Sequence, residues 1–378
     1  MMSQLLQKIA RYDRFVSRRS VLGPIGIEFS MEKIHMVQIG MRANGEKYLV
    51  GCASADYPTK RDAFLSEPGE MKATLRRLMK QNGFSGSSAV VAALPGMARI
   101  VPVTYQLGKD QADEDAIIKI MRNRIDGSLD EYVIDYLPIR SGGADDDRLA
   151  MVAFARKSDV IAFLERLRHS GLSITAMEVA PSAINRLITI ISGEDPGSNI
   201  LVVSTGYQIS FMTMISGDRV LFDHKVNFGE ADLLFELSEM LDMGQEEARD
   251  LIIKNGLFAD EDPEKDGLVS RPDIAEGIRE IVKPGFMKLV DEVNRSLIYA
   301  AAQTHGKSAN RIYLLGVISR WPGVDRLLGR MANIAITIPD PLRTLTNENG
   351  PCSGGSVGSN TDMAIATGLA LRGLDQHG

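Results

Sequence analysis

The chain has 378 residues and 44% of them are hydrophobic, which allows two domains or one bilobed unit with a large core. A net charge of -6 is mild for this length, so the composition does not favour nucleic acid as a partner. Cys52 and Cys352 make no disulfide framework and are expected to be free thiols. With no apolar run near the roughly 18 residues of a membrane span and no secretory signal, we expect a cytoplasmic protein.

The first segment, Met1–Ser20, is predicted to be a basic amphipathic extension. Leu5, Ile9, Tyr12 and Val16 share one helical face, and five basic side chains against one acid give a local charge of +4. Such helices are attracted to anionic lipid surfaces. Contact with a membrane surface, contact with a partner, and packing on its own domain all fit this pattern.

Two stretches of the chain repeat one plan of strands. The segments GPIGIEFS, KIHMVQIGM and KYLVGCASADYP predict a three-stranded meander over Gly23–Pro58. Ser198–Gly229 repeats the plan, with two strands joined by a tight turn and a third strand after a Gly-Asp turn. This repetition is expected for a fold built from two similar halves.

Between these stretches, strands and helices are mixed. SSAVVAALPG predicts a short buried strand, with ARIVPVTYQL as its neighbour. EYVIDYLPIR and RLAMVAFAR predict a hairpin closed by a polar loop, and KSDVIAFLERLRHSGL predicts an amphipathic helix. SITAMEVAPSAINRLI reads as a strand followed by a helix.

Beyond the second meander the chain is mainly helical. An acidic, turn-rich segment, Ala259–Pro272, precedes a long helical stretch that we expect to be interrupted near Pro284 and Gly285. The stretch Thr346–Asn360 is expected to be a mobile loop of Gly, Ser and Asn.

The end of the chain predicts a β-turn-α unit. In NRIYLLGVISRWPGVDRLL an apolar strand enters a turn at Gly316, and Pro322 and Gly323 open an amphipathic helix. A helix of small residues, TDMAIATGLALRGL, closes the chain.

No catalytic or metal-binding motif occurs in the sequence. The five histidines have no ligand spacing, and no GxSxG, HExxH, GxxxxGK[ST] or GxGxxG element is present. We therefore predict no catalytic residue and no metal site.

Nine phrases in a fixed order carry a family resemblance. They are GIEFSMEKIHMVQI, AVVAALPGMARIVPV, YVIDYLPI, MVAFARKSDVIAFLERLRHSGLSITAMEVAPSAINRL, VNFGEADLL, EEARDLIIKNG, EVNRSLIYA, LLGVISRWPGVDRLL and AIATGLALR. Together, over Leu22–Gly373, they resemble the PilM family of type IV pilus assembly proteins, relatives of the cell-division protein FtsA.

The resemblance implies an actin-like α/β fold, as in FtsA and heat-shock chaperone ATPases, with two lobes and an α+β subdomain inserted into the first. The first lobe would comprise 21–85 and 180–197, the inserted subdomain 86–179, and the second lobe with the final helix 198–378. Such proteins sit on the cytoplasmic face of the inner membrane. They capture the N-terminal cytoplasmic tail of a single-span partner, PilN, and the inserted subdomain contributes to the groove. The resemblance leaves open whether the chain forms a homo-oligomer.

The same resemblance locates a vestigial nucleotide site, in which several residues depart from the family pattern. Ser30 ends the phosphate turn that begins with Glu28, Ser204 replaces the acid of the second turn, and Ala180 replaces a glutamate on the connecting strand. Gly206 is retained, whereas Met31 and Glu32 make the first turn bulky and negative. The adenosine turn reads Gly316-Val317-Ile318 in place of three glycines, so side chains are expected where adenosine would lie.

These departures favour a non-enzymatic pseudo-ATPase scaffold without a cofactor. An active switch of the same family, binding ATP and magnesium weakly through altered contacts, is the first alternative. A sugar or metabolite kinase of the actin superfamily is the second, and it would need a carboxylate base and intact phosphate turns.

Overall fold

The computed structural model describes residues 20–108, 111–139, 147–193, 199–217, 219–258, 272–303, 309, 311–347, 360–372 and 374. The predictions for the amphipathic extension, the acidic segment, most of the Gly/Ser/Asn loop and Cys352 lie outside the described residues. None of the helices in these ranges is long and apolar enough to cross a membrane.

The first lobe is built on a six-stranded sheet. Its strands β1 (Val21–Phe29), β2 (Lys33–Met41) and β3 (Lys47–Asp56) form the predicted antiparallel meander. The parallel strands β4 (Ser88–Ala92) and β8 (Ser173–Glu178) extend it beside β1. Helices α2 (Arg61–Ser66), α3 (Pro68–Gln81) and α5 (Lys157–His169) cover one face, where Phe29, Phe64, Met71 and Phe163 are buried together.

The second lobe repeats this plan in a five-stranded sheet of order β11-β10-β9-β12-β13. Its strands are β9 (Asn199–Thr205), β10 (Ser210–Ser216), β11 (Arg219–Val226), β12 (Arg311–Gly316) and β13 (Ile336–Thr337). Strand β12 runs parallel to β9 as β4 runs parallel to β1, which confirms the two similar halves. The helices of this lobe are α7 (Glu230–Leu241), α8 (Gln245–Asn255), α9 (Pro272–Gln303) and α10 (Val324–Ala332).

Helix α9 runs without interruption through Pro284, contrary to the predicted break. Val282 and Phe286, on either side of the proline, are fully buried in the core of the second lobe. Gly285 lets α7 approach closely, because a Cβ there would lie 2.5 Å from Leu233 Cδ2. Tertiary packing therefore offsets the hydrogen bond that proline removes from the helix.

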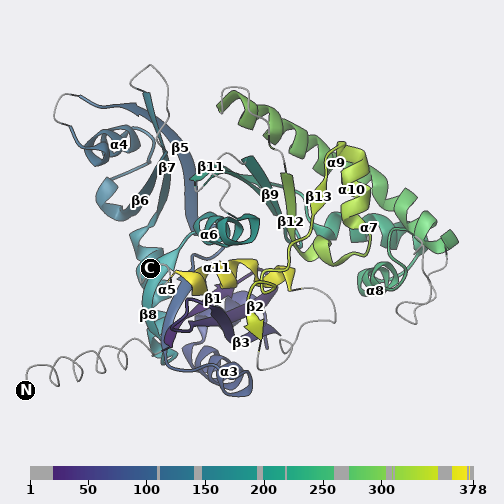
Figure 1. Ribbon diagram of the computed structural model, residues 1–378, viewed down its shortest axis with the longest axis horizontal. Helices are drawn as coiled ribbons and strands as arrows, with labels where there is room; N and C mark the ends of the chain where they lie inside the picture. Colours follow the sequence, from purple (N-terminus) through teal and green to yellow (C-terminus); the bar gives the residue numbers. More distant parts are fainter. Residues whose placement is uncertain are drawn as a thin grey trace, which may run out of the picture.

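A separate three-stranded sheet has the order β5-β7-β6. It consists of β5 (Ala98–Gln106), β6 (Tyr132–Ile139) and β7 (Asp147–Arg156), and α4 (Asp113–Arg122) packs on one face. The predicted hairpin of β6 and β7 is confirmed. This unit lies at one end of the molecule, where its strands contact β11 of the second lobe (Figure 1).

The boundaries 86–179 of the inserted subdomain were too wide. Strands β4 and β8 lie inside these boundaries but pair in the six-stranded sheet, and β4 is not a neighbour of β5. The run Ala89–Ala92 is buried along its whole length, as expected of a central parallel strand. The separate sheet spans only residues 98–156.

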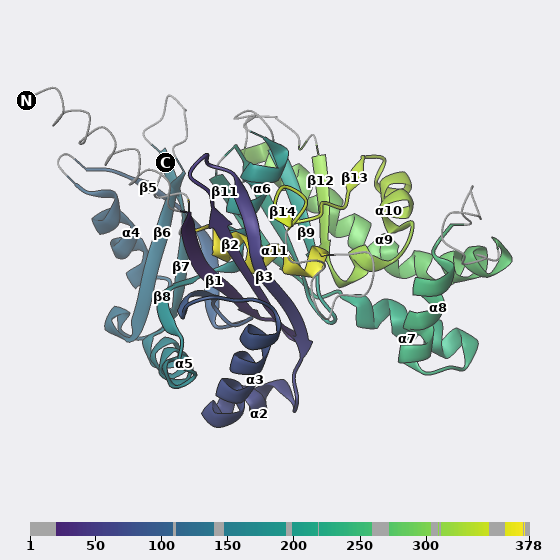
Figure 2. The same ribbon diagram turned by 60° about the horizontal axis from the view of Figure 1, so that its bottom comes forward.

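Two helices, α6 (Ala180–Ser192) and α11 (Ala364–Leu371), lie between the two large sheets (Figures 1 and 2). Small residues allow backbone-to-backbone contact here. A Cβ at Gly26 of β1 would lie 2.1 Å from the Ala366 carbonyl oxygen, and one at Gly368 would lie 2.0 Å from that of Ala183. The buried cluster around these helices joins residues of both sheets.

The final helix therefore does not belong to the second lobe alone, as the limits 198–378 implied. Helix α11 packs on β1, β2 and β4, and β14 (Thr346–Asn347) pairs with β3, so the expected loop begins as a strand. Cys52 on β3 is buried and disulfide-bonded, which corrects the prediction of a free thiol.

Candidate functional site

The turn between β1 and β2 stands where a phosphate turn is expected, but it satisfies its own amides. Ser30 Oγ accepts hydrogen bonds from the backbone amides of Lys33 at 2.9 Å and Glu32 at 3.3 Å, and donates to the Lys33 carbonyl at 2.9 Å. Tyr57 and Arg61 donate to the Ser30 carbonyl at 2.7 and 2.9 Å. A phosphate would have to displace the serine hydroxyl to reach these amides.

The second turn, between β9 and β10, is also closed on itself. The Gly206 amide donates to the Ile209 carbonyl at 3.1 Å, and a Cβ at Gly206 would lie 2.5 Å from that oxygen. The first amides of α7, those of Glu230 and Ala231, donate to the carbonyls of Gly206 and Tyr207. Ser204 Oγ is shielded from water and has no hydrogen-bond partner.

The third turn keeps its glycine for packing. Gly316 has φ +86° and its Cβ position lies 2.0 Å from the Thr205 carbonyl oxygen, so only glycine fits. Thr205 Oγ1 accepts from the Ile318 amide at 3.1 Å. Val317 and Ile318 are buried in the core of the second lobe, because the 3-10 turn Val317–Arg320 directs them inward. The expectation that they would lie where adenosine binds is therefore wrong.

Charged side chains from both lobes gather beside these turns. We call them the charge cluster: Glu28, Glu32, Glu230, Arg249, Arg320 and Asp362. Glu230 is almost fully buried and accepts from Arg249 Nη2 at 2.7 Å, Arg249 Nε at 3.1 Å and Trp321 Nε1 at 3.0 Å. Arg320 Nη1 lies 3.5 Å from Asp362 Oδ2. Both guanidinium groups are thus paired with carboxyl groups of the chain, Arg249 with Glu230 and Arg320 with Asp362.

Glu28 is the acid at the end of β1, and its environment keeps it protonated. Burial, together with the nearby Asp362 carboxylate, raises its pKa to about 8. Glu28 Oε2 and Asp362 Oδ1 are both shielded from water without a hydrogen-bond partner. Burial likewise raises the pKa of Glu32. Magnesium at Glu28 would first have to displace this proton.

Ala180 was expected on the connecting strand. It is instead the first residue of α6, and Pro181 follows it in the first turn of that helix. The carboxylate nearest to it in sequence, Glu178, ends β8 and is occupied elsewhere. Arg186 donates to both of its oxygens at 3.0 Å, and Arg372 pairs with Oε1. This network holds β8, α6 and the end of α11 together and engages both carboxylate oxygens of Glu178.

ATP with magnesium does not fit these residues. The amides of Glu32, Lys33 and Gly206 are engaged within the chain, and both arginines of the charge cluster are paired with carboxyl groups. Within the described ranges, no group of three or more His, Cys, Asp or Glu side chains is placed to hold a metal ion.

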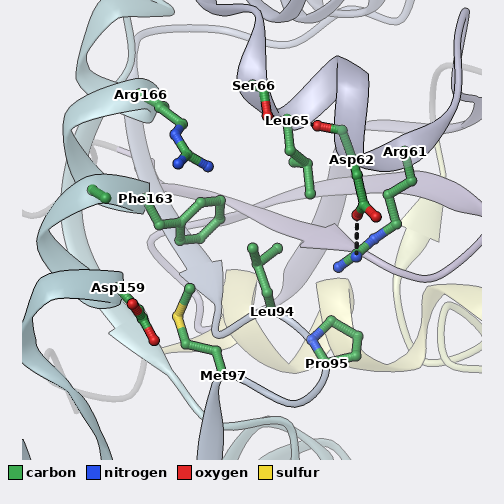
Figure 3. A pocket seen from close by; sticks show the side chains of 11 residues that line it. Arg61, Asp62, Leu65, Ser66, Leu94, Pro95, Met97, Asp159, Phe163 and Arg166 are labelled. Carbon is green, nitrogen blue, oxygen red and sulfur yellow. Dashed lines mark hydrogen bonds and ion pairs between the residues drawn. The ribbon is translucent and has the colours of Figure 1, made fainter.

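A pocket of about 390 Å³ lies between α2, α5 and the connection from β4 to β5. Figure 3 shows Leu65, Leu94, Met97 and Phe163 directed toward its middle. Charged side chains of both signs surround this apolar floor: Arg61, Asp62, Asp159 and Arg166. We call it the α2–α5 pocket, and its composition suits a short peptide with apolar anchors and polar flanks.

Sequence reasoning located the three turns but missed the residues that fill the space beside them. Glu230, Arg249, Trp321 and Asp362 come from four separate segments, and no spacing rule connects them. The α2–α5 pocket was missed for the same reason, although the predicted helix at Lys157–His169 supplies one wall.

The fold places the chain among actin-like proteins. Its structure matches that of a PilM–PilN type IV pilus biogenesis complex with a TM-score of 0.72 and 20% identity, over 93% of this chain and 98% of the other. Ethanolamine utilization protein EutJ of Carboxydothermus hydrogenoformans matches with a TM-score of 0.51 and 14% identity, over 93% and 92% of the two chains. MreB5 of Spiroplasma citri, bound to ADP, matches with a TM-score of 0.51 and 10% identity, over 96% and 100%.

Comparison by sequence shows to which of these families the chain belongs. No curated protein matches the chain in sequence. The family model described as type IV pilus assembly protein PilM matches residues 26–374, nearly the whole described structure. The chain therefore belongs to the PilM family of type IV pilus assembly proteins.

Proposed function

We propose that the chain is a non-enzymatic scaffold of type IV pilus assembly on the cytoplasmic side of the inner membrane. The observation that carries the non-enzymatic part is the occupied β1–β2 turn, in which Ser30 Oγ takes the amides of Glu32 and Lys33. Hydrolysis in this fold needs phosphate and magnesium held at these turns and a polar group that orients water. The chain's own side chains and carbonyls hold these positions instead.

The scaffold binds the N-terminal cytoplasmic tail of a PilN-like single-span membrane protein in the α2–α5 pocket. A PilM–PilN complex shares the fold over 93% of this chain, which supports this type of partner. Leu65, Leu94 and Phe163 offer an apolar floor for an anchoring side chain of the tail. Arg61 and Arg166, with Asp62 and Asp159 nearby, fix the direction of the tail through its charged groups.

Two neighbouring residues of α5 provide the experiment. Ala162 lines the pocket, whereas Ile161 is 47% exposed and does not. Ala162→Arg fills the pocket and is expected to weaken binding of a labelled tail peptide at least about tenfold, measured by fluorescence anisotropy. Ile161→Arg introduces the same side chain outside the pocket and is expected to bind like the unmodified chain.

Equal binding by both variants would reject the pocket as the docking site. Hydrogen exchange of the full chain with and without the tail then locates the true surface. Protection of α2 and α5 is expected, and protection confined to the second lobe would contradict the assignment. A requirement for ATP and magnesium in tail binding would favour the nucleotide switch over the scaffold.

A further inference from the structure

We propose that Phe258, Arg279, Arg326 and Arg330 form a second docking site, which binds an acidic peptide segment of a partner protein. We call these residues the Phe258 arginine cluster. The guanidinium carbons of Arg279, Arg326 and Arg330 lie over the Phe258 ring, 5.2, 5.1 and 4.9 Å from its centroid. Phe258 lies in the segment that follows α8, Arg279 on α9, and Arg326 and Arg330 on α10.

Backbone contacts on two sides fix the position of the Phe258 ring. Gly256, with φ +66°, ends α8, and the Leu257 amide donates to the Pro322 carbonyl at 2.9 Å. Gly323 lies so close that a Cβ would be 3.0 Å from Phe258 Cδ2. The aromatic face that organises the arginines is therefore positioned by backbone contacts on two sides.

Three guanidinium groups around one ring repel one another. A phenyl ring has two faces, so at least two of the three guanidinium groups share a face. Arg326 and Arg330 are also four residues apart on α10, where like charges destabilise a helix. The attraction of each cation to the ring offsets only part of this repulsion. A carboxylate between the arginines would relieve it.

Two of the arginines are available for this anion. Arg279 is already paired with Glu276 at 3.1 Å and Glu280 at 3.7 Å. Arg326 and Arg330 are exposed and, within the described part of the chain, form no ion pair. Stacking over the ring leaves the N–H groups at the edges of their guanidinium planes free, which suits forked binding of carboxylate oxygens.

The surroundings of the cluster favour a peptide over an extended polyanion. The carboxylates of Glu276 and Glu280 flank it and are 69% and 57% exposed. A membrane surface or a nucleic acid would bring many phosphates close to these acids, which repel them. One or two acidic side chains of a peptide bring less negative charge near the flanking carboxylates.

The site is separate from the α2–α5 pocket. Helices α8 and α10 lie on one side of the molecule and α5 on the other in both views (Figures 1 and 2). One molecule can therefore hold a partner at each site at the same time. A scaffold that binds a membrane-protein tail in the α2–α5 pocket thus has a second contact site of different chemistry, the Phe258 arginine cluster.

The test uses the full chain and a fluorescein-labelled peptide with two glutamates between Gly-Ser flanks, with binding followed by anisotropy at low salt. Arg326→Gln with Arg330→Gln is expected to weaken binding at least about tenfold. Lys288→Gln with Arg295→Gln is the matched control, because it removes the same charge from exposed positions of α9. The control is expected to bind like the unmodified chain.

Three results would overturn the proposal. Equal affinity of the two double variants would show that only net charge attracts the peptide. Binding of phosphatidylglycerol vesicles, but not of the peptide, through Arg326 and Arg330 would make the ligand a membrane. Peptide binding that appears only after the five acids of residues 259–271 are replaced by amides would make the chain's own segment the occupant.

Discussion

Glu28 ends β1 beside Asp362, and burial raises the pKa of this carboxyl group from 4.5 to about 8. Between these two pH values the folded state holds a proton that the unfolded state has released. The free energy of unfolding therefore falls as the pH rises through this window. Glu28→Gln removes this contribution, so its melting temperature is expected to gain on that of the unmodified chain as the pH rises.

Thermal unfolding at several pH values measures this difference. Glu239→Gln, at an exposed position of α7, is the control and is expected to leave the pH dependence unchanged. A Glu28→Gln curve that stays parallel to the unmodified one across the window would contradict the protonated state of Glu28.

Ser30 and Ser204 carry a prediction about turnover. Loss of one well-placed electrostatic group typically costs about 2.7–4 kcal/mol of transition-state stabilisation, or about 10²–10³ in rate. Ser30 Oγ fills the first turn and Ser204 offers no charge at the second, so phosphate release from ATP is expected to equal the background. Ala180→Asp is also expected to stay inactive, because it adds an acid without freeing either turn. Turnover by the unmodified chain that Glu28→Ala abolishes would restore the nucleotide switch.

At the scale of elements, the contact between β1 and α11 leaves no room for an added side chain. Gly26→Ala would place a methyl group 2.1 Å from the Ala366 carbonyl oxygen, so the helix has to move away from the sheet. We expect a loss of about 1–3 kcal/mol in the free energy of unfolding, measured by denaturant titration. Gly277→Ala on α9 is the control, because no atom lies within 4 Å of its Cβ position. A helical glycine-to-alanine change there is expected to stabilise by about 0.5–1 kcal/mol, and equal effects at both positions would contradict the close packing of α11.

For the whole molecule, the pair of Arg320 and Asp362 connects the second lobe to the segment that leads back to the first sheet. Both side chains are mostly buried, with exposed fractions of 20% and 15%. Arg320→Met leaves the carboxylate without its partner and is expected to cost about 1–3 kcal/mol in the free energy of unfolding. The double variant Arg320→Met with Asp362→Leu is expected to recover part of this loss. Additive losses in denaturant unfolding would show that the two residues do not act as a pair.

Periodicity and turn residues predicted the two meanders, because side chains alternate along a strand whatever lies beyond it. The neighbour of β4 was predicted wrongly. Consecutive strands usually pair, and only the burial of the run Ala89–Ala92 on both faces shows that it is central. The inward direction of Val317 and Ile318 depends on a 3-10 turn that no pattern of apolar residues reveals.

The candidate site was predictable only in part. The three turns follow from the order of strands, and the family resemblance identified their changed residues. The pairing of Glu230 with Arg249 and Trp321 joins positions up to 91 residues apart, and the side of the sheet on which each lies is decided by tertiary packing. The same holds for the arginines that meet over Phe258.

The hydroxyl of Ser30 is tethered to the amides that it occupies, so it is present at a high effective concentration at all times. A dissolved nucleotide competes with this internal group on unequal terms, whatever the energy state of the cell. We expect cells that are starved and cells that are growing to contain the same conformer of this protein. Control over assembly would then depend on how many partner tails are available, and the ratio of ATP to ADP would have no effect on it.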